Sequence, residues 1–141
     1  MGTRREAREL ALQALYQLDL TGEEDVGVGA HFGGSAEAVA FARELIDGVR
    51  SKRDRIDELI AAASQHWRLP RLSRVDLSLL RLSTYELLAC PDIPASVTID
   101  EAIEIARRFG SEDSAAFVNG VLDAIATSVG AKDKEKTERP E

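Results

Sequence analysis

Apolar residues recur through most of the chain every three or four positions, which is the spacing of one face of an α-helix. The first series comprises Ala7, Leu10, Ala11, Ala14, Leu15 and Leu18. Two further series, at 38–49 and 56–63, predict a second helical region. Thr3 and Ser51 each precede an acidic residue by three positions, so we expect them, like Ser35, to cap helix starts.

The segment 75–88 holds more leucine than one narrow apolar stripe can accommodate. We therefore expect this helix, capped by Ser73, to be central and largely buried. After a rigid connector at 90–94, apolar positions at 103–109 and 117–125 predict two more helices.

Three residues mark the boundaries of these last helices. Thr98, followed by Glu101, has the spacing of a capping box at a helix start. We expect Gly110 to take a left-handed conformation after one helix, and Gly130 to end the last one.

No stretch alternates apolar and polar residues as a half-buried strand does. The sequence therefore predicts an all-α domain of six or seven helices within residues 1–130. The glycine-rich segment 21–35 is expected to be a loop. The tail 131–141 is charged and almost without apolar residues, so it is expected to be disordered.

The formal net charge of −7 argues against a surface coated with cations for indiscriminate nucleic-acid binding. Any RNA site must then be local. Cys90 is the single cysteine, so no disulfide forms within the chain, and no Cys/His cluster suggests a metal or a cofactor. No apolar run approaches the roughly 20 residues of a membrane-spanning helix, so we expect a cytoplasmic protein without a membrane partner.

Catalysis has no recognisable constellation in this sequence. His31 and His66 lack a nucleophile or a paired carboxylate at a familiar spacing. The acidic residues at 100–104 are explained by their place near a helix start, where the helix dipole favours negative charge. We expect the chain not to be an enzyme.

Arg4, Arg5 and Arg8 lie in the first turns of the first helix, where the dipole disfavours cations. At helical spacing, Arg5 and Arg8 share one side with Tyr16, so a basic strip is predicted to run toward an aromatic ring. Guanidinium groups and rings suit single-stranded RNA. From this feature alone, a solvated helix face is the simpler interpretation.

A second group of candidates surrounds the predicted turn at 110–114. Phe109 and Phe117 flank it, and Asp113 lies within it. Exposed rings could stack on bases, and the carboxylate could accept from a base amino group. Periodicity alone favours a core position for Phe117 and a helix-start role for Asp113. Asp76 is most simply a residue at a helix start.

Several segments resemble the family of the bacterial antitermination factor NusB. Arg8-Glu9 and the QALY sequence at 13–16 are similar to its start, and LRLSTYEL at 80–87 to its central helix. The C-terminal segments DEAIEIA at 100–106, FGSEDS at 109–114 and FVNGVLD at 117–123 resemble that family nearly residue for residue.

The resemblance implies about seven helices in two packed sub-bundles. It also implies binding of boxA RNA from ribosomal leader transcripts, together with the small-subunit protein NusE, within the RNA polymerase antitermination complex. By position, the residues expected to contact RNA are Arg4, Arg5, Arg8, Phe109, Asp113 and Phe117. Tyr16 and Asp76 match the NusE-facing surface. A helical protein-interaction module without RNA binding remains the alternative.

Overall fold

The computed structural model describes residues 2–22, 34–64 and 72–131. Within these ranges the chain forms α-helices and no strand, which confirms the all-α prediction. The helices are α1 (Gly2–Thr21), α2 (Ala36–Ser51), α3 (Arg53–Ser64), α4 (Arg74–Ala89), α5 (Ala95–Phe109) and α6 (Ser114–Ser128). The predictions for most of the glycine-rich loop, for both histidines and for the tail fall on residues outside the described part.

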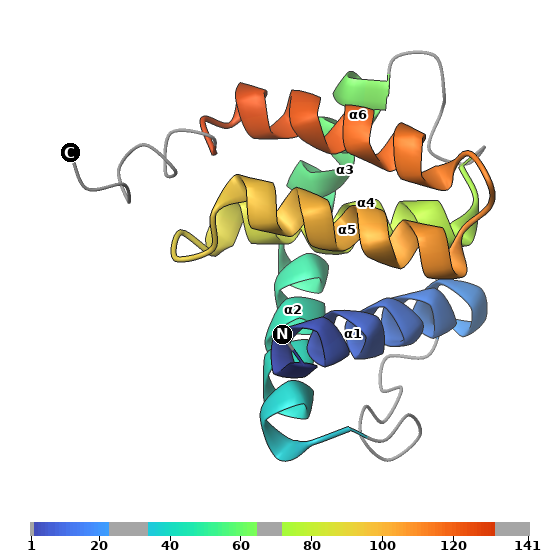
Figure 1. Ribbon diagram of the computed structural model, residues 1–141, viewed down its shortest axis with the longest axis vertical. Coiled ribbons are helices and arrows are strands. Elements are labelled where there is room, and N and C mark those ends of the chain that lie inside the picture. The colour runs from blue at the N-terminus through green and yellow to red at the C-terminus, as the bar shows by residue number, and fades with distance from the viewer. Residues whose placement is uncertain (1, 23–33, 65–71, 132–141) are drawn as a thin grey trace.

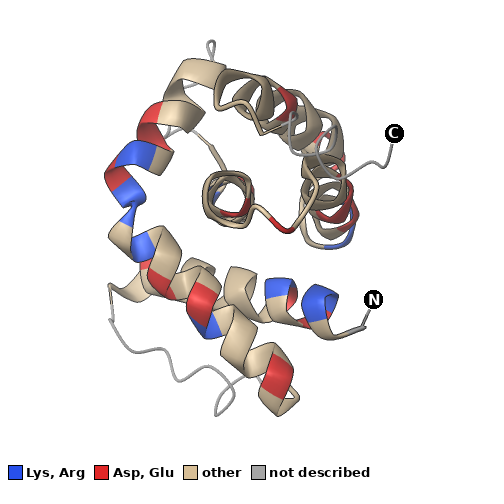
Figure 2. Cartoon of the chain, turned by 90° about the vertical axis from the view of Figure 1, so that its left-hand side faces the viewer, with Lys and Arg blue, Asp and Glu red and all other residues tan. Residues whose placement is uncertain are grey.

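Helix α4 lies at the centre of the molecule and contacts each of the other five helices. Figure 2 shows it almost end-on, with the other helices around it. Leu79, Leu80 and Leu82 are fully buried, as the leucine-rich pattern predicts. The helices α1 and α2 pack together on one side of α4, and α5 and α6 pack together on another, so the two predicted sub-bundles share this helix (Figure 1).

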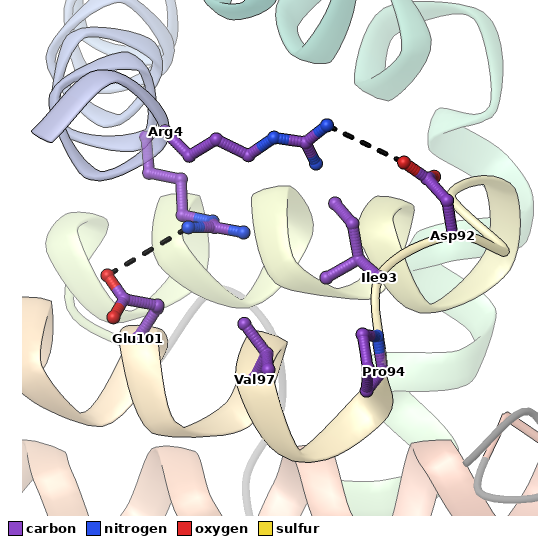
Figure 3. Close-up of a pocket in the computed structure, with 7 residues that line it drawn as sticks. Arg4, Asp92, Ile93, Pro94, Val97 and Glu101 are labelled. Carbon is purple, nitrogen blue, oxygen red and sulfur yellow. Dashed lines mark ion pairs between the residues drawn. The ribbon is translucent and has the colours of Figure 1, made fainter. Parts of the chain in front are cut away.

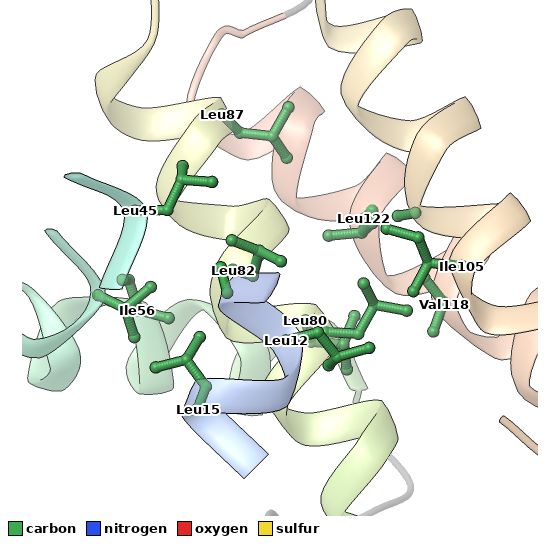
Figure 4. Close-up of a cluster of buried hydrophobic side chains, with 14 of the residues drawn as sticks. Leu12, Leu15, Leu45, Ile56, Leu80, Leu82, Leu87, Ile105, Val118 and Leu122 are labelled. Carbon is green, nitrogen blue, oxygen red and sulfur yellow. The ribbon is translucent and has the colours of Figure 1, made fainter. Parts of the chain in front are cut away.

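The core consists of aliphatic side chains that converge on α4 from all sides (Figure 4). Leu12 comes from α1, Leu45 from α2, Ile56 from α3, Ile105 from α5 and Leu122 from α6, and each is buried. Every helix therefore buries its apolar stripe against a common centre, which is the main stabilisation that the hydrophobic effect supplies here.

Two predicted helix starts are confirmed and three are wrong. The hydroxyl oxygens of Ser35 and Ser73 accept from the backbone N–H groups three residues on, at 3.2 and 3.1 Å. The helix at Thr3 has already begun at Gly2. Ser51 is still inside α2, and Lys52 separates it from α3.

The third wrong cap is Thr98, which lies inside α5. That helix begins at Ala95, directly after Pro94, whose carbonyl accepts from the N–H groups of Val97 and Thr98 at 3.0 and 3.2 Å. Proline has its φ fixed by its ring and is suited to the start of a helix, so α5 begins four residues earlier than the capping motif at Thr98 predicts. The Thr98 hydroxyl instead donates to Glu86 at 3.2 Å.

The two glycines at helix ends behave differently. Gly130 ends the last helix as predicted: it has φ +72°, a left-handed conformation, and the N–H of Ala131 donates to the Ala126 carbonyl at 2.9 Å. Gly110 is extended, with φ −94° and ψ −170°, so its left-handed prediction is wrong. A Cβ there would lie 2.5 Å from the Ser114 Oγ and 2.8 Å from the Ala106 carbonyl oxygen. Glycine is required at this position because Ser114 and the Ala106 carbonyl leave no space for a Cβ.

Gly110→Ala should therefore lower the free energy of unfolding by about 2 kcal/mol, because the added methyl group overpacks against the α5 backbone. Gly120→Ala is the matched control, since nothing lies within 4 Å of a Cβ at that site in α6. The control should be neutral or stabilise by up to about 1 kcal/mol through helix propensity. Urea denaturation of both variants measures the contrast, and equal effects would contradict it.

Candidate nucleic-acid interface

A buried ion pair joins α1 to α4. Arg8 is 4% exposed and donates from Nε and Nη2 to the two carboxylate oxygens of Glu86, at 2.8 and 2.9 Å. Glu86 is fully buried and also accepts from the Thr98 hydroxyl of α5. One carboxylate thus connects three helices. The expectation that Arg8 is displayed as part of a basic strip is wrong, because the buried carboxylate holds it inside.

The charge on Arg8 is secured by this partner. Removal from water would lower the pKa of the guanidinium, but the hydrogen bonds and the negative charge of Glu86 outweigh that effect and raise the pKa. Arg8 therefore keeps its charge in the interior, where a charge without a partner is costly.

Arg5 bridges α1 to α5 closer to the surface. It donates to both carboxylate oxygens of Glu101, at 2.9 and 2.8 Å, and 40% of its side chain is exposed. The hydrogen bond and charge of Arg5 hold the pKa of Glu101 below its usual value. Arg4, half exposed, lies 4.7 Å over the Phe41 ring and forms an ion pair with Asp92 at 3.5 Å.

A second ion pair between α1 and α5, with the charges reversed, lies near the end of α5. Glu9 of α1 binds Arg108, whose guanidinium lies 5.3 Å from the centre of the Phe109 ring. The helices α1 and α5 therefore run side by side in the same direction, and we call the surface along Arg4, Arg5, Arg108 and Phe109 the α1–α5 seam. Arg108 was not among the residues predicted from the sequence, although it directly precedes a candidate ring.

The turn between α5 and α6 adds the remaining RNA candidates. Phe109 is 39% exposed, which is high for a large apolar side chain. Asp113 is exposed at the start of α6 and its side chain caps no backbone N–H. Phe117 is half-buried and packs against the core, so it has less free surface than Phe109. The seam and this turn are continuous because Phe109 ends α5.

The seam does not carry unbalanced positive charge. Its guanidinium groups each have a carboxylate partner, on Asp92, Glu101 or Glu9. Partly exposed pairs of this kind contribute about 0–1 kcal/mol, so phosphates could replace these carboxylates at small cost. The buried pair of Arg8 cannot be exchanged in this way.

The candidate partner residues lie elsewhere on α1 and α4. Tyr16 is half-buried on α1. Asp76, in the first turn of α4, has its Oδ1 buried without a hydrogen-bond partner among the described residues. A buried carboxylate oxygen without a donor is unfavourable and would gain from one that a partner supplies.

A second charged cluster, which the sequence analysis missed, joins α1, α3 and α4. Arg81 is buried and donates to both carboxylate oxygens of Asp57, at 2.8 and 3.0 Å. Arg74 donates to the Asp19 carbonyl at 3.4 Å, and Arg53 forms ion pairs with both aspartates. The sequence signal for this cluster was Arg81, a charged residue within the leucine-rich helix. The cluster fixes the other end of α1 against α4.

Other chemistries find little support in the described ranges. No group of three or more potential ligands could hold a metal ion there. None of the described helices is long and apolar enough to cross a membrane.

Arg8→Met should reduce the free energy of unfolding by about 3–5 kcal/mol, because it leaves the Glu86 charge buried and uncompensated. Arg4→Met is the control: its pair is exposed, so the loss should stay below about 1 kcal/mol. The double variant Arg8→Met/Glu86→Leu should recover most of the loss. Urea unfolding that found the two single variants equally mild would show that the buried pair does not hold the helices.

Glu101→Gln should destabilise the fold by about 1 kcal/mol at neutral pH, since it removes a partly exposed ion pair. The lowered pKa of Glu101 in the folded state means that its stabilisation is complete above the unfolded value, about 4.3, and is lost as the pH falls through the folded value. The variant and the parent should therefore converge in stability as the pH falls from the unfolded value through the lowered folded pKa. Thermal unfolding across pH measures this, and a constant difference would contradict it.

Comparison with known proteins supplies the family. A family model described as the NusB family matches residues 5–127. The transcription antitermination protein NusB of Geobacter sp. (strain M21) is 48% identical, over 94% of this chain and 100% of its own length. The protein of the same description from Myxococcus xanthus is 48% identical, over 92% of this chain and 98% of its own.

Solved structures agree with this. T. maritima NusB superposes with a TM-score of 0.83 at 42% identity, covering 94% of this chain and 96% of that one. A structure described as antitermination factors NusB and NusE in complex with dsRNA superposes with a TM-score of 0.80 at 28% identity, covering 91% and 98%. The chain belongs to the NusB family.

Proposed function

We propose that this chain is a transcription antitermination factor that binds boxA RNA of ribosomal leader transcripts together with a NusE protein, and that it joins the RNA polymerase antitermination complex. The observation that carries the proposal is the α1–α5 seam, which sets the guanidinium groups of Arg4 and Arg5 on the same surface as the exposed Phe109 ring. The names of the relatives support the process, and the structure with NusE and dsRNA supports the partners.

Each RNA-binding candidate has a role in this proposal. Arg4 and Arg5 offer guanidinium groups to the RNA, and Phe109 offers a face on which an unpaired base stacks. Asp113 accepts from a base amino group, and the free edge of Phe117 extends the ring surface. The main contribution of Arg8 is to position the start of α1, which its buried pair with Glu86 holds in place.

We assign the binding of NusE to Tyr16 and Asp76. The support is the half-buried ring of Tyr16 and the unpartnered Oδ1 of Asp76, which a donor from a partner would satisfy. The role is one of assembly without catalysis, and action on nascent transcripts places the chain in the cytoplasm.

Arg5→Gln tests the RNA assignment. If Arg5 contacts one phosphate, the slope of log affinity against log salt should become shallower by about 0.7, the contribution of one contact on a single strand. Arg55→Gln, which changes an exposed cation on α3, should leave the slope unchanged. Fluorescence anisotropy with boxA and scrambled RNA, with and without NusE, gives these values. Equal slopes for the two variants would remove Arg5 from the interface.

The paired state of the seam guanidinium groups favours a second candidate, a protein-interaction module that binds no RNA. The same titration separates the two. In the alternative, boxA RNA fails to bind with or without NusE, while Asp76→Lys still abolishes the complex with NusE.

A further inference from the structure

A pocket of about 380 Å³ opens between the start of α1 and the connector that leads into α5. Arg4 and Arg8 line it, together with the apolar side chains of Ile93, Pro94 and Val97 (Figure 3). The carboxylates of Asp92 and Glu101 lie at its two ends, where dashed lines mark their ion pairs with the arginines. The pocket thus combines donors, acceptors and an apolar wall.

Several polar groups in this pocket have hydrogen-bonding capacity to spare. The Nε and Nη2 groups of Arg8 donate hydrogen bonds to Glu86. Its Nη1, among the described residues, forms only an ion pair with Glu101, at 3.9 Å. The side chain of Arg8 is 5% exposed, so the Nη1 group is held in the wall of the pocket. Arg4 and Asp92 are 3.5 Å apart and make no hydrogen bond within the described part of the chain.

The apolar wall is partly exposed. Val97 is 42% exposed, which is among the highest values for a large apolar residue in the described part of the chain. Val97 and Pro94 lie on the same side of the pocket, across from Arg4 (Figure 3). A flat base that packs on this wall would present its edge to the polar groups of the pocket.

We infer that this pocket binds one unpaired guanine base of the RNA. Guanine presents two adjacent acceptors, O6 and N7, which match a guanidinium group, and two adjacent donors, N1–H and the 2-amino group, which match a carboxylate. Arg4, which lies over the Phe41 ring, donates to O6 and N7. Asp92 accepts from N1–H and the 2-amino group. The Nη1 of Arg8 donates to the base from the pocket wall.

The other bases fit this set of groups less well. Adenine and cytosine offer a single amino donor group beside a ring acceptor, and uracil offers one donor between two acceptors. None of these three bases can form two hydrogen bonds with a guanidinium group and, at the same time, two with a carboxylate. The inference rests on the proposed RNA binding and assigns it a base preference.

The test is a cycle of RNA and protein changes. A short single-stranded oligouridine carrying one guanine is compared with the same RNA carrying inosine, which lacks the 2-amino group, or adenine. The full-length parent protein should prefer guanine over adenine by about 10-fold, within the range of one bidentate base contact. Asp92→Asn should abolish the difference between guanine and inosine. Asp100→Asn, an equal charge change on exposed α5 surface outside the pocket, should retain it.

A second measurement does not depend on a variant. In the parent protein, guanosine 5′-monophosphate should shift the methyl resonances of Ile93 and Val97, and adenosine 5′-monophosphate should shift them less. RNA that binds without guanine preference, or a preference that survives Asp92→Asn, overturns the pocket assignment and leaves the proposed function intact. Absence of any RNA binding overturns both. Methyl shifts produced by NusE alone, with none from the guanine nucleotide, would assign the pocket to the protein partner and overturn the inference.

Discussion

The arrangement of the helices depends on one buried contact, between Arg8 of α1 and Glu86 of α4. A lone ion in this position would be strongly destabilising, and the pair is tolerable because the guanidinium group meets both carboxylate oxygens and Thr98 supplies a further donor. Because Arg8 is fixed in this way, Arg4 and Arg5 are held at the surface above α5 and its connector. The interior contact thus determines where the exposed cations lie.

Features set by local sequence were predicted well. The leucine-rich pattern of α4, the serine caps at Ser35 and Ser73 and the glycine end at Gly130 all depend on residues within one or two helical turns. The wrong predictions depend on more distant groups. The proline before α5 overrode the capping motif at Thr98, and the closeness of Ser114 and Ala106 set the conformation of Gly110.

The candidate site shows the same division. The sequence indicated which arginines and rings to consider, but the partners of those arginines are far away in the chain: Glu86 is 78 residues from Arg8 and Glu101 is 96 from Arg5. Helical periodicity places a residue on a face of its own helix and does not show what that face meets. For this reason Arg8 was expected at the surface, and the pairing of Arg108 with Glu9 and the pocket beside Arg4 were not predicted.

The signs of the charges along α1 and α5 have a consequence for the alignment of these helices. Arg5 faces an acid and Glu9 faces a base, so the order of charges on α1 is the reverse of that on α5. A slip of α1 by one turn would set Glu9 against Glu101, or Arg5 against Arg108, and like charges would meet. Alternating polarity therefore specifies one register for two helices that are bridged mainly by long side chains.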